Sequence, residues 1–199
     1  LYEGVDIGGD EGTVGLISYM RTDSVNLSQD ALAEIRDVIA RDYGIASLPD
    51  QRNTYKTTSK NAQDAHEAVR PTSALRTPSQ VARFLTDDER KLYELIWKRA
   101  VACQMIPATL NTVSVDLSAG SEHVFRASGT TVVVPGFLAV YEEGKDSKSA
   151  EDDDEGRKLP AMKPGDRVPL ERIVADQHFT QPPPRFTEAA LVKALEEYG

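Results

Sequence analysis

Residues 14–24, VGLISYMRTDS, pass from an apolar, strand-prone run to a polar turn within a few positions. The apolar half suits a short strand in a core, and the polar half is typical of the turn that leaves such a strand. Tyr19 would then stand near the end of a rigid element. Because residues i and i+2 of an extended segment point to the same side, we expect the Tyr19 phenol and the Arg21 guanidinium to share one face.

A phenol beside a fixed cation suits nucleophilic attack on a phosphodiester. An unperturbed tyrosine has a pKa of about 10, so it is a poor nucleophile until a neighbour favours the phenolate. Arginine does this, and its planar fork also grips phosphate oxygens. On spacing alone, however, a Tyr-x-Arg pair more often reflects packing beside a solvated charge, so the pair by itself is a weak hint.

Longer matches change this balance. Three segments resemble, in the expected order, motifs of the type IA DNA topoisomerases: residues 15–24 (GLISYMRTDS), 61–72 (NAQDAHEAVRPT) and 177–193 (QHFTQPPPRFTEAALVK). The first is similar to the active-site segment, and the third to the entry into a later domain. Met20 after Tyr19 and EAVR after His66 look like the bacterial topoisomerase I branch rather than its topoisomerase III-type sibling.

The resemblance implies roles for single residues. Tyr19 would attack a DNA backbone phosphate and keep it as a 5′-phosphotyrosine, while Arg21 would bind the non-bridging oxygens. His66 looks like the residue that contacts the phosphate backbone near the cleavage site. Arg70 and Arg185 are further expected DNA contacts. The implied activity cuts and rejoins one DNA strand and relaxes negative supercoils.

The resemblance also implies parts that this sequence lacks. The family's toprim-type domain supplies a glutamate and the Mg²⁺ carboxylates, and it precedes the region matched here. We therefore expect a central fragment of a multidomain toroidal enzyme, with single-stranded DNA and the parent's other domains as partners and no metal ligands of its own. The acidic triplet 152–154 is expected to be solvated, and no phosphate-cradling loop points to ATP. Alone, the fragment should not relax DNA.

Composition limits the alternatives. Among the 199 residues, 40% are hydrophobic, and no apolar run approaches 18 residues, so we expect a soluble chain without a membrane span. The single Cys103 excludes an internal disulfide and fits a reducing cytoplasm. The net charge of −9 is unusual for a protein that binds phosphates, although the loop 142–158 contributes much of it. A non-catalytic single-strand-binding module remains an alternative, but aromatic and basic residues do not interleave as such a module requires.

The expected fold class is α+β. A mainly helical active-site tyrosine domain should cover residues 1–107, and an antiparallel β-rich arch segment residues 108–180, with the acidic loop at 142–158. Residues 181–199 should open the next helical domain, which lines the DNA groove.

Helical spacing and capping residues predict helices over residues 29–43, after the N-cap Ser28, and over residues 61–69. A third helix should begin after Thr86, whose capping box includes Glu89, and run towards Pro107 with Trp97 in its apolar stripe. Thr187 should cap a last helix. On the predicted helix 61–69, His66 and Arg70 would lie on one face.

Alternating hydrophobic residues predict the strands. Residues 1–13 should form a loop, and strands are expected at 113–117, 124–127 and 130–134. Residues 137–141 should continue the second hairpin, and residues 168–174 should form a final strand at an edge or bulge.

Overall fold

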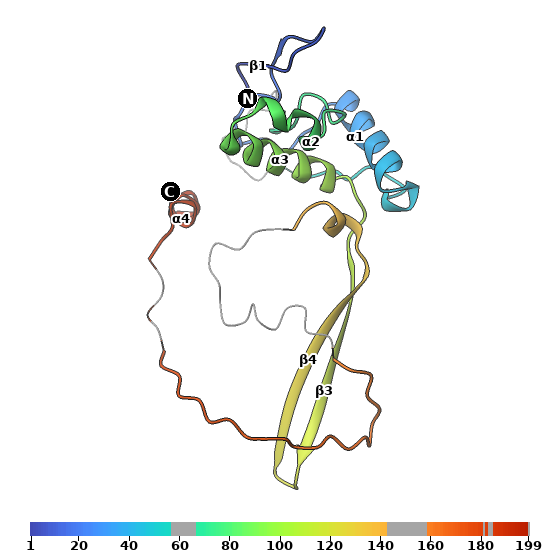
Figure 1. The fold of residues 1–199 in the computed structure, drawn as a ribbon, viewed down its shortest axis with the longest axis vertical. Helices are drawn as coiled ribbons and strands as arrows, with labels where there is room; N and C mark the ends of the chain where they lie inside the picture. Colours follow the sequence, from blue (N-terminus) through green and yellow to red (C-terminus); the bar gives the residue numbers. More distant parts are fainter. Residues whose placement is uncertain (57–66, 143–158, 181, 183–184, 199) are drawn as a thin grey trace. The chain divides into compact units, whose positions relative to one another are not determined.

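The computed structural model describes residues 1–56, 67–142, 159–180, 182 and 185–198. It divides into two compact units, Leu1–Thr109 with Val132–Glu142, and Leu110–Thr131 with Glu143–Gly199. Helices dominate the N-terminal part, and a long antiparallel hairpin follows it (Figure 1). The α+β class predicted from the sequence is therefore confirmed.

The first unit is built on three α-helices, α1 (Gln29–Asp42), α2 (Pro78–Val81) and α3 (Asp87–Ala102). Short 3-10 helices lie between or after them: η1 (Ile45–Ser47), η2 (Ala82–Phe84) and η3 (Gly136–Ala139). The predicted helix at 29–43 is confirmed by α1. Its N-cap is Ser28, whose hydroxyl accepts a hydrogen bond from the backbone N–H of Ala31 at 3.3 Å.

α3 begins as its sequence predicts. The Thr86 hydroxyl accepts from the Glu89 backbone N–H, and the Glu89 carboxylate accepts from the Thr86 backbone N–H at 2.9 Å, which completes the capping box. Tyr93, Trp97 and Val101 form the buried side of the helix. Leu92, on the same helix, is 48% exposed, so the buried face does not extend to it.

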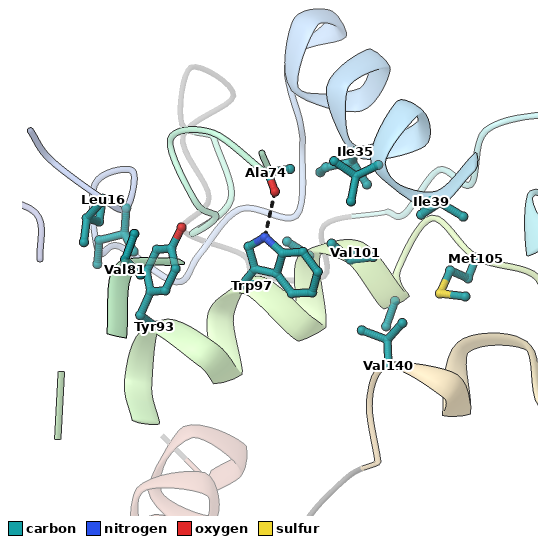
Figure 2. Close-up of a cluster of buried hydrophobic side chains, with 14 residues drawn as sticks. Leu16, Ile35, Ile39, Ala74, Val81, Tyr93, Trp97, Val101, Met105 and Val140 are labelled. Carbon is teal, nitrogen blue, oxygen red and sulfur yellow. Dashed lines mark hydrogen bonds between the residues drawn. The ribbon is translucent and has the colours of Figure 1, made fainter. Parts of the chain in front are cut away.

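One hydrophobic cluster joins these helices. It includes Leu16 from the N-terminal segment, Ile35 and Ile39 from α1, and Trp97 from α3 (Figure 2). The Trp97 indole Nε1 donates to the Ala74 carbonyl oxygen at 2.9 Å, so its one polar atom is satisfied inside the core. Trp97 is thus a core anchor, as predicted, and its indole is unavailable for stacking on a base.

The predicted loop at residues 1–13 is wrong in part. β1 (Val5–Asp6) and β2 (Thr13–Val14) pair antiparallel, with Val5 opposite Val14. The turn between them needs left-handed backbone, which Gly8, Gly9 and Gly12 supply with φ of 72°, 62° and 59°. Glycine richness here therefore marks a tight hairpin rather than an unstructured lead.

The second sheet is a two-stranded hairpin of β3 (Thr109–Ala119) and β4 (His123–Val134). Its register is shown by facing side chains: the Thr112 and Thr130 hydroxyls lie 3.0 Å apart, and Asp116 accepts from Arg126 at 2.7 Å. These polar pairs share one face, so the alternating Val113, Val115 and Leu117 lie on the other. The predicted alternation over 113–117 is confirmed.

Three strand predictions are corrected. Residues 124–127 and 130–134 belong to one continuous strand, because Gly129 stays extended and does not break β4. Residues 137–141 do not continue the hairpin. Gly136 has a φ of 50° and lies against the backbone of Pro107, too close for a side chain, and the chain turns into η3 there. Residues 168–174 form no strand, and Leu170 and Ile173 are 77% and 82% exposed.

The second unit also contains α4 (Glu188–Tyr198), which confirms the predicted last helix. The Thr187 hydroxyl accepts from the Ala190 backbone N–H at 3.1 Å and caps it. Among the described residues, no helix is both long enough and apolar enough to cross a membrane.

Candidate functional site

The segment that precedes Tyr19 is paired with a segment about fifty positions later in the chain. Ile17 and Pro71 form an antiparallel bridge. The Thr72 backbone N–H donates to the Leu16 carbonyl at 2.9 Å, and the Ser18 backbone N–H donates to the Arg70 carbonyl at 2.8 Å. The described part of the second motif, residues 67–72, thus lies beside the first motif.

Ser18 ends this pairing. Its hydroxyl donates to the Ala68 carbonyl at 2.8 Å and accepts from the Arg70 backbone N–H at 2.9 Å. Ser18 therefore makes three hydrogen bonds to residues 68–70, two through the hydroxyl and one through the backbone. The next residue is Tyr19.

Tyr19 leaves the paired segment into solvent. Its side chain is 52% exposed, and its ring meets the Tyr2 ring edge to face, with centroids 5.4 Å apart and planes at 65°. The chain around residue 2 lies close because Gly15 has no side chain. A Cβ there would come within 2.8 Å of the Tyr2 carbonyl oxygen. Tyr19 thus follows a hydrogen-bonded backbone segment, and about half of the residue is exposed.

Arg21 follows Tyr19 by two residues and pairs with an acid. Its Nε lies 2.8 Å from Oδ2 of Asp23, and the two side chains are 41% and 16% exposed. Both Asp23 carboxylate oxygens are inaccessible to solvent and have no aligned hydrogen bond among the described residues, so the contact is an ion pair rather than a directed hydrogen bond. The expected shared face of Tyr19 and Arg21 stays a prediction.

Arg70 is held by its own surroundings. Its Nε and Nη2 donate to the two Glu67 carboxylate oxygens at 2.8 and 3.0 Å, and its Nη1 donates to the Pro71 carbonyl at 2.8 Å. Glu67 also accepts from the Ser28 backbone N–H at 2.7 Å, beside the start of α1. Partial burial alone would raise the pKa of Glu67, but the hydrogen bonds from Arg70 and Ser28 outweigh it and lower that pKa.

The predicted helix at 61–69 is wrong where it is described. Residues 67–70 are not helical, and the Ala68 backbone N–H donates instead to the Asn26 carbonyl at 2.7 Å. The argument that His66 and Arg70 share a helix face loses its basis. His66 itself, with the rest of residues 57–66, lies outside the described residues.

The chain on both sides of residues 57–66 is anchored. On the near side, the buried Gln104 accepts from the Asn53 backbone N–H at 3.2 Å and donates to the Asn53 carbonyl at 3.1 Å. The Tyr55 hydroxyl donates to the Cys103 carbonyl at 2.7 Å. On the far side, Ser18 holds residues 68–70.

The other predicted site features are Arg185, the absence of metal ligands and the acidic triplet. Arg185 is exposed and belongs to the second unit. Among the described residues, no three or more His, Cys, Asp or Glu side chains are grouped as a metal site. The predicted acidic triplet 152–154 lies outside the described part of the chain.

Sequence patterns missed Ser18 and Asp23, each of which contacts a predicted site residue or its backbone. A single serine or aspartate near a turn does not indicate its partner. Only the match of residues 15–24 and 61–72 to motifs of one family indicated that these stretches belong to one site.

Comparisons with known proteins agree with this architecture. A family model described as DNA topoisomerase matches residues 1–199. DNA topoisomerase 1 of Xylella fastidiosa is 77% identical over 199 residues, which are all of this chain and 24% of that protein. DNA topoisomerase 1 of Rickettsia felis is 48% identical over 200 residues, which cover all of this chain and 25% of that protein.

A solved structure agrees as well. Full-length topoisomerase I from Thermotoga maritima superposes with a TM-score of 0.70 and 29% identity, covering 100% of this chain and 30% of that one. The chain spans about a quarter of the length of the curated relatives it matches. With its full length matched by the family model and the tyrosine motif on an ordered backbone, the chain belongs to the DNA topoisomerase family.

Proposed function

We propose that this chain is the active-site tyrosine part of a type IA DNA topoisomerase, which cleaves and rejoins one DNA strand and relaxes negative supercoils without ATP. The observation that carries the proposal is the placement of Tyr19. Its phenol is exposed at the end of a paired, hydrogen-bonded segment, and Arg21 follows two residues later.

The proposed reaction is a transesterification. The Tyr19 phenolate oxygen bonds to a backbone phosphorus while the bond from phosphorus to the 3′ oxygen breaks. The 3′ oxygen takes up a proton and leaves as a hydroxyl, and the 5′ phosphate stays on Tyr19. Attack of the 3′ hydroxyl on the phosphotyrosine reverses the step. One phosphodiester replaces another, so the free energy of the bond is conserved and no nucleotide hydrolysis is needed.

Arg21 is the proposed phosphate ligand. Its guanidinium would donate to the non-bridging oxygens and stabilise the charge that develops on them in the transition state. The contact with Asp23 is at Nε, and the two Nη atoms are the proposed donors to the phosphate. The attraction of the Asp23 carboxylate keeps the guanidinium beside it without a directed hydrogen bond.

The remaining predicted site residues have supporting roles. His66 is proposed to hold the DNA backbone near the cleavage site by donating to a phosphate oxygen. Arg70 was expected to contact DNA, but its three guanidinium nitrogens already donate to Glu67 and to the Pro71 carbonyl. We therefore propose that Arg70 shapes the segment after His66. Arg185 remains a proposed contact to the single strand.

Mg²⁺ and a general acid belong to the proposed enzyme but not to these residues. The described part of the chain offers no cluster of carboxylates that fits a metal ion. The proposed ligands lie in a toprim-type domain of the same protein. We propose that the three regions 1–107, 108–180 and 181–199 work with that domain in the cytoplasm, and that this part alone does not turn over.

Two alternatives are distinguished by other observations. A topoisomerase III-type sibling is disfavoured by the relatives in Xylella and Rickettsia, which are named DNA topoisomerase 1. A non-catalytic single-strand-binding module would bind DNA without forming a covalent bond, and its binding would not depend on the Tyr19 hydroxyl.

The test is plasmid relaxation by the full-length protein that carries this chain, with Mg²⁺ and without ATP. Wild type should relax negatively supercoiled DNA, and Tyr19→Phe should not, although both bind single-stranded DNA. Tyr198→Phe is the matched control, because that tyrosine is 90% exposed at the end of α4. Relaxation by Tyr19→Phe, or binding without relaxation by wild type, would contradict the proposal.

A further inference from the structure

We propose that Ser18 is a positioning residue for cleavage, because its hydroxyl ends the pairing of residues 16–18 with residues 70–72 and so sets where Tyr19 leaves the backbone pair. This inference rests on the proposed function. It assigns a role in the reaction to a side chain that does not itself touch the phosphate.

The hydrogen-bond pattern shows how the pairing ends. In a regular antiparallel ladder, every second pair of facing residues exchanges two backbone hydrogen bonds, one in each direction. Ser18 and Arg70 face one another beside the bridge of Ile17 and Pro71, and the Ser18 N–H donates to the Arg70 carbonyl as that pattern requires. The return bond is different. The Arg70 N–H donates to the Ser18 hydroxyl at 2.9 Å, in the place where a regular pair would use the Ser18 carbonyl.

The exchange frees the backbone at the next residue. Because the hydroxyl satisfies the Arg70 N–H, the peptide between Ser18 and Tyr19 is not required to continue the extended pairing. The same hydroxyl donates its proton to the Ala68 carbonyl at 2.8 Å, so it is fixed from both sides. A hydroxyl offers one donor and two acceptor positions, and Ser18 uses the donor and one of the acceptors.

The partner segment leads back to His66. Ala68 and Arg70 follow it by two and four residues, and the Ala68 N–H is itself fixed by the Asn26 carbonyl at 2.7 Å. A shift of Ser18 relative to residues 68–70 would move Tyr19 against this anchored segment. Misplacement by a fraction of an ångström is enough to slow a reaction that depends on in-line attack.

Removal of the hydroxyl gives a definite result. Ser18→Ala leaves the Arg70 N–H and the Ala68 carbonyl without their partner, or it lets the pair close in the regular manner and turns Tyr19 away. Either outcome lowers the rate constant of covalent adduct formation, on the order of tenfold for the loss of a buried partner. The affinity for single-stranded DNA stays as in wild type, since Ser18 touches no phosphate.

The experiment uses the full-length protein and a 3′-labelled single-stranded oligonucleotide. Single-turnover adduct formation gives the cleavage rate constant, and anisotropy of the Tyr19→Phe background gives the affinity with and without each second substitution. Ser18→Thr keeps a hydroxyl and should cleave near the wild-type rate. Ser18→Cys keeps the size of the side chain but bonds weakly, and should be slower than wild type.

Thr72→Val is the matched control. The Thr72 hydroxyl donates to the Gly15 carbonyl at 2.7 Å, so it ties the same two segments at the end away from Tyr19. Loss of the Thr72 hydroxyl should lower the thermal midpoint of unfolding but should not lower the cleavage rate constant as Ser18→Ala does. If Ser18→Ala proves unfolded, the comparison of Ser18→Cys with Thr72→Val decides.

Three results would overturn the assignment: a wild-type rate in Ser18→Ala or Ser18→Cys, a rate in Ser18→Thr as low as in Ser18→Ala, or an equal drop in Thr72→Val. Absence of any adduct in wild type would instead contradict the proposed function, so the two failures are distinct.

Discussion

The Nε atom of Arg21 lies 2.8 Å from Oδ2 of Asp23, and the acid is the more buried partner, with its side chain 16% exposed against 41% for the arginine. A cation two residues after the proposed nucleophile is thus held on one side by a carboxylate that solvent does not reach. The ion pair partly compensates the positive charge of Arg21, whose side chain is the more exposed of the two.

Arg21→Lys should lower the cleavage rate constant by roughly tenfold to a thousandfold, because an ammonium cannot bind two phosphate oxygens as a fork. Asp23→Asn should cause a smaller loss, since the guanidinium keeps its charge but loses the partner that orients it. Single-turnover cleavage measures both. Arg90→Lys on α3, whose nearest ion-pair contacts are 3.8 Å, is the control and should cleave as wild type does.

Trp97→Phe should lower the free energy of unfolding by about 1–3 kcal/mol, because the buried Ala74 carbonyl loses its donor. Chemical denaturation monitored by circular dichroism measures the change. Ile45→Ala is the control, since Ile45 is 80% exposed and a surface truncation changes stability little. An unchanged midpoint in Trp97→Phe would mean that the hydrogen bond contributes nothing.

The buried phenol of Tyr93 should make the fold less stable at high pH. Burial raises the pKa of Tyr93 to about 12, and its hydroxyl donates to the Arg76 carbonyl at 2.7 Å. The unfolded phenol titrates near 10, so the stability from the buried neutral form is complete below about pH 10 and is lost as the pH rises towards 12.

The measurement is urea denaturation at about pH 9 and about pH 11, on either side of the ordinary tyrosine value. Between these two pH values, the free energy of unfolding of wild type should fall more than that of Tyr93→Phe. Tyr93→Phe should also be less stable at neutral pH, because the Arg76 carbonyl loses its donor. Parallel curves for the two proteins would count against this account.

The ionised Glu67 carboxylate should make the fold less stable at low pH, where it becomes protonated. The pKa of its carboxyl lies below the ordinary value of 4.5 in the folded chain, where Arg70 and Ser28 donate to it. A depressed pKa contributes stability that is present above the unfolded value and is lost as the pH falls through the folded one. The thermal midpoint of wild type should therefore fall below about pH 4.5 more steeply than that of Glu67→Gln.

Glu3→Gln, at an exposed position, is the control and should follow wild type across the same range. If Glu67→Gln and wild type lose stability in parallel, the ion pair with Arg70 does not stabilise the fold and its role is confined to shaping the loop.

Short sequence patterns predicted the features that depend only on neighbouring residues, such as helix caps and the buried face of a helix. Ser28 and Thr86 cap their helices because each cap needs only the next three residues, and Trp97 is buried because its stripe lies on one helix. Capping and helical periodicity are short-range physics, so one sequence suffices to predict them.

The same reasoning could not predict the pairing of segments that are far apart in the sequence. Residues 67–69 belong to the helix predicted at 61–69, but they are not helical. Ala68 and Arg70 form hydrogen bonds with Ser18 and Asn26 instead, some forty to fifty positions away. Residues 168–174 alternate as a strand does, yet a strand also needs a neighbour to pair with, and propensity says nothing about that. Ser18 was missed for the same reason, since its partners Ala68 and Arg70 are brought near it only by the fold.

The most direct test of the account is the chemical identity of the residue that becomes attached to DNA. Full-length protein is mixed with Mg²⁺ and either 3′-labelled or 5′-labelled single-stranded DNA, denatured, and digested for mass spectrometry. We expect only the 3′ label to remain covalently bound, on the peptide that contains Tyr19 and through a 5′ phosphate, with no adduct in Tyr19→Phe. Attachment of the 5′ label, attachment at another residue, or an adduct in Tyr19→Phe would contradict the assignment of Tyr19 as the nucleophile.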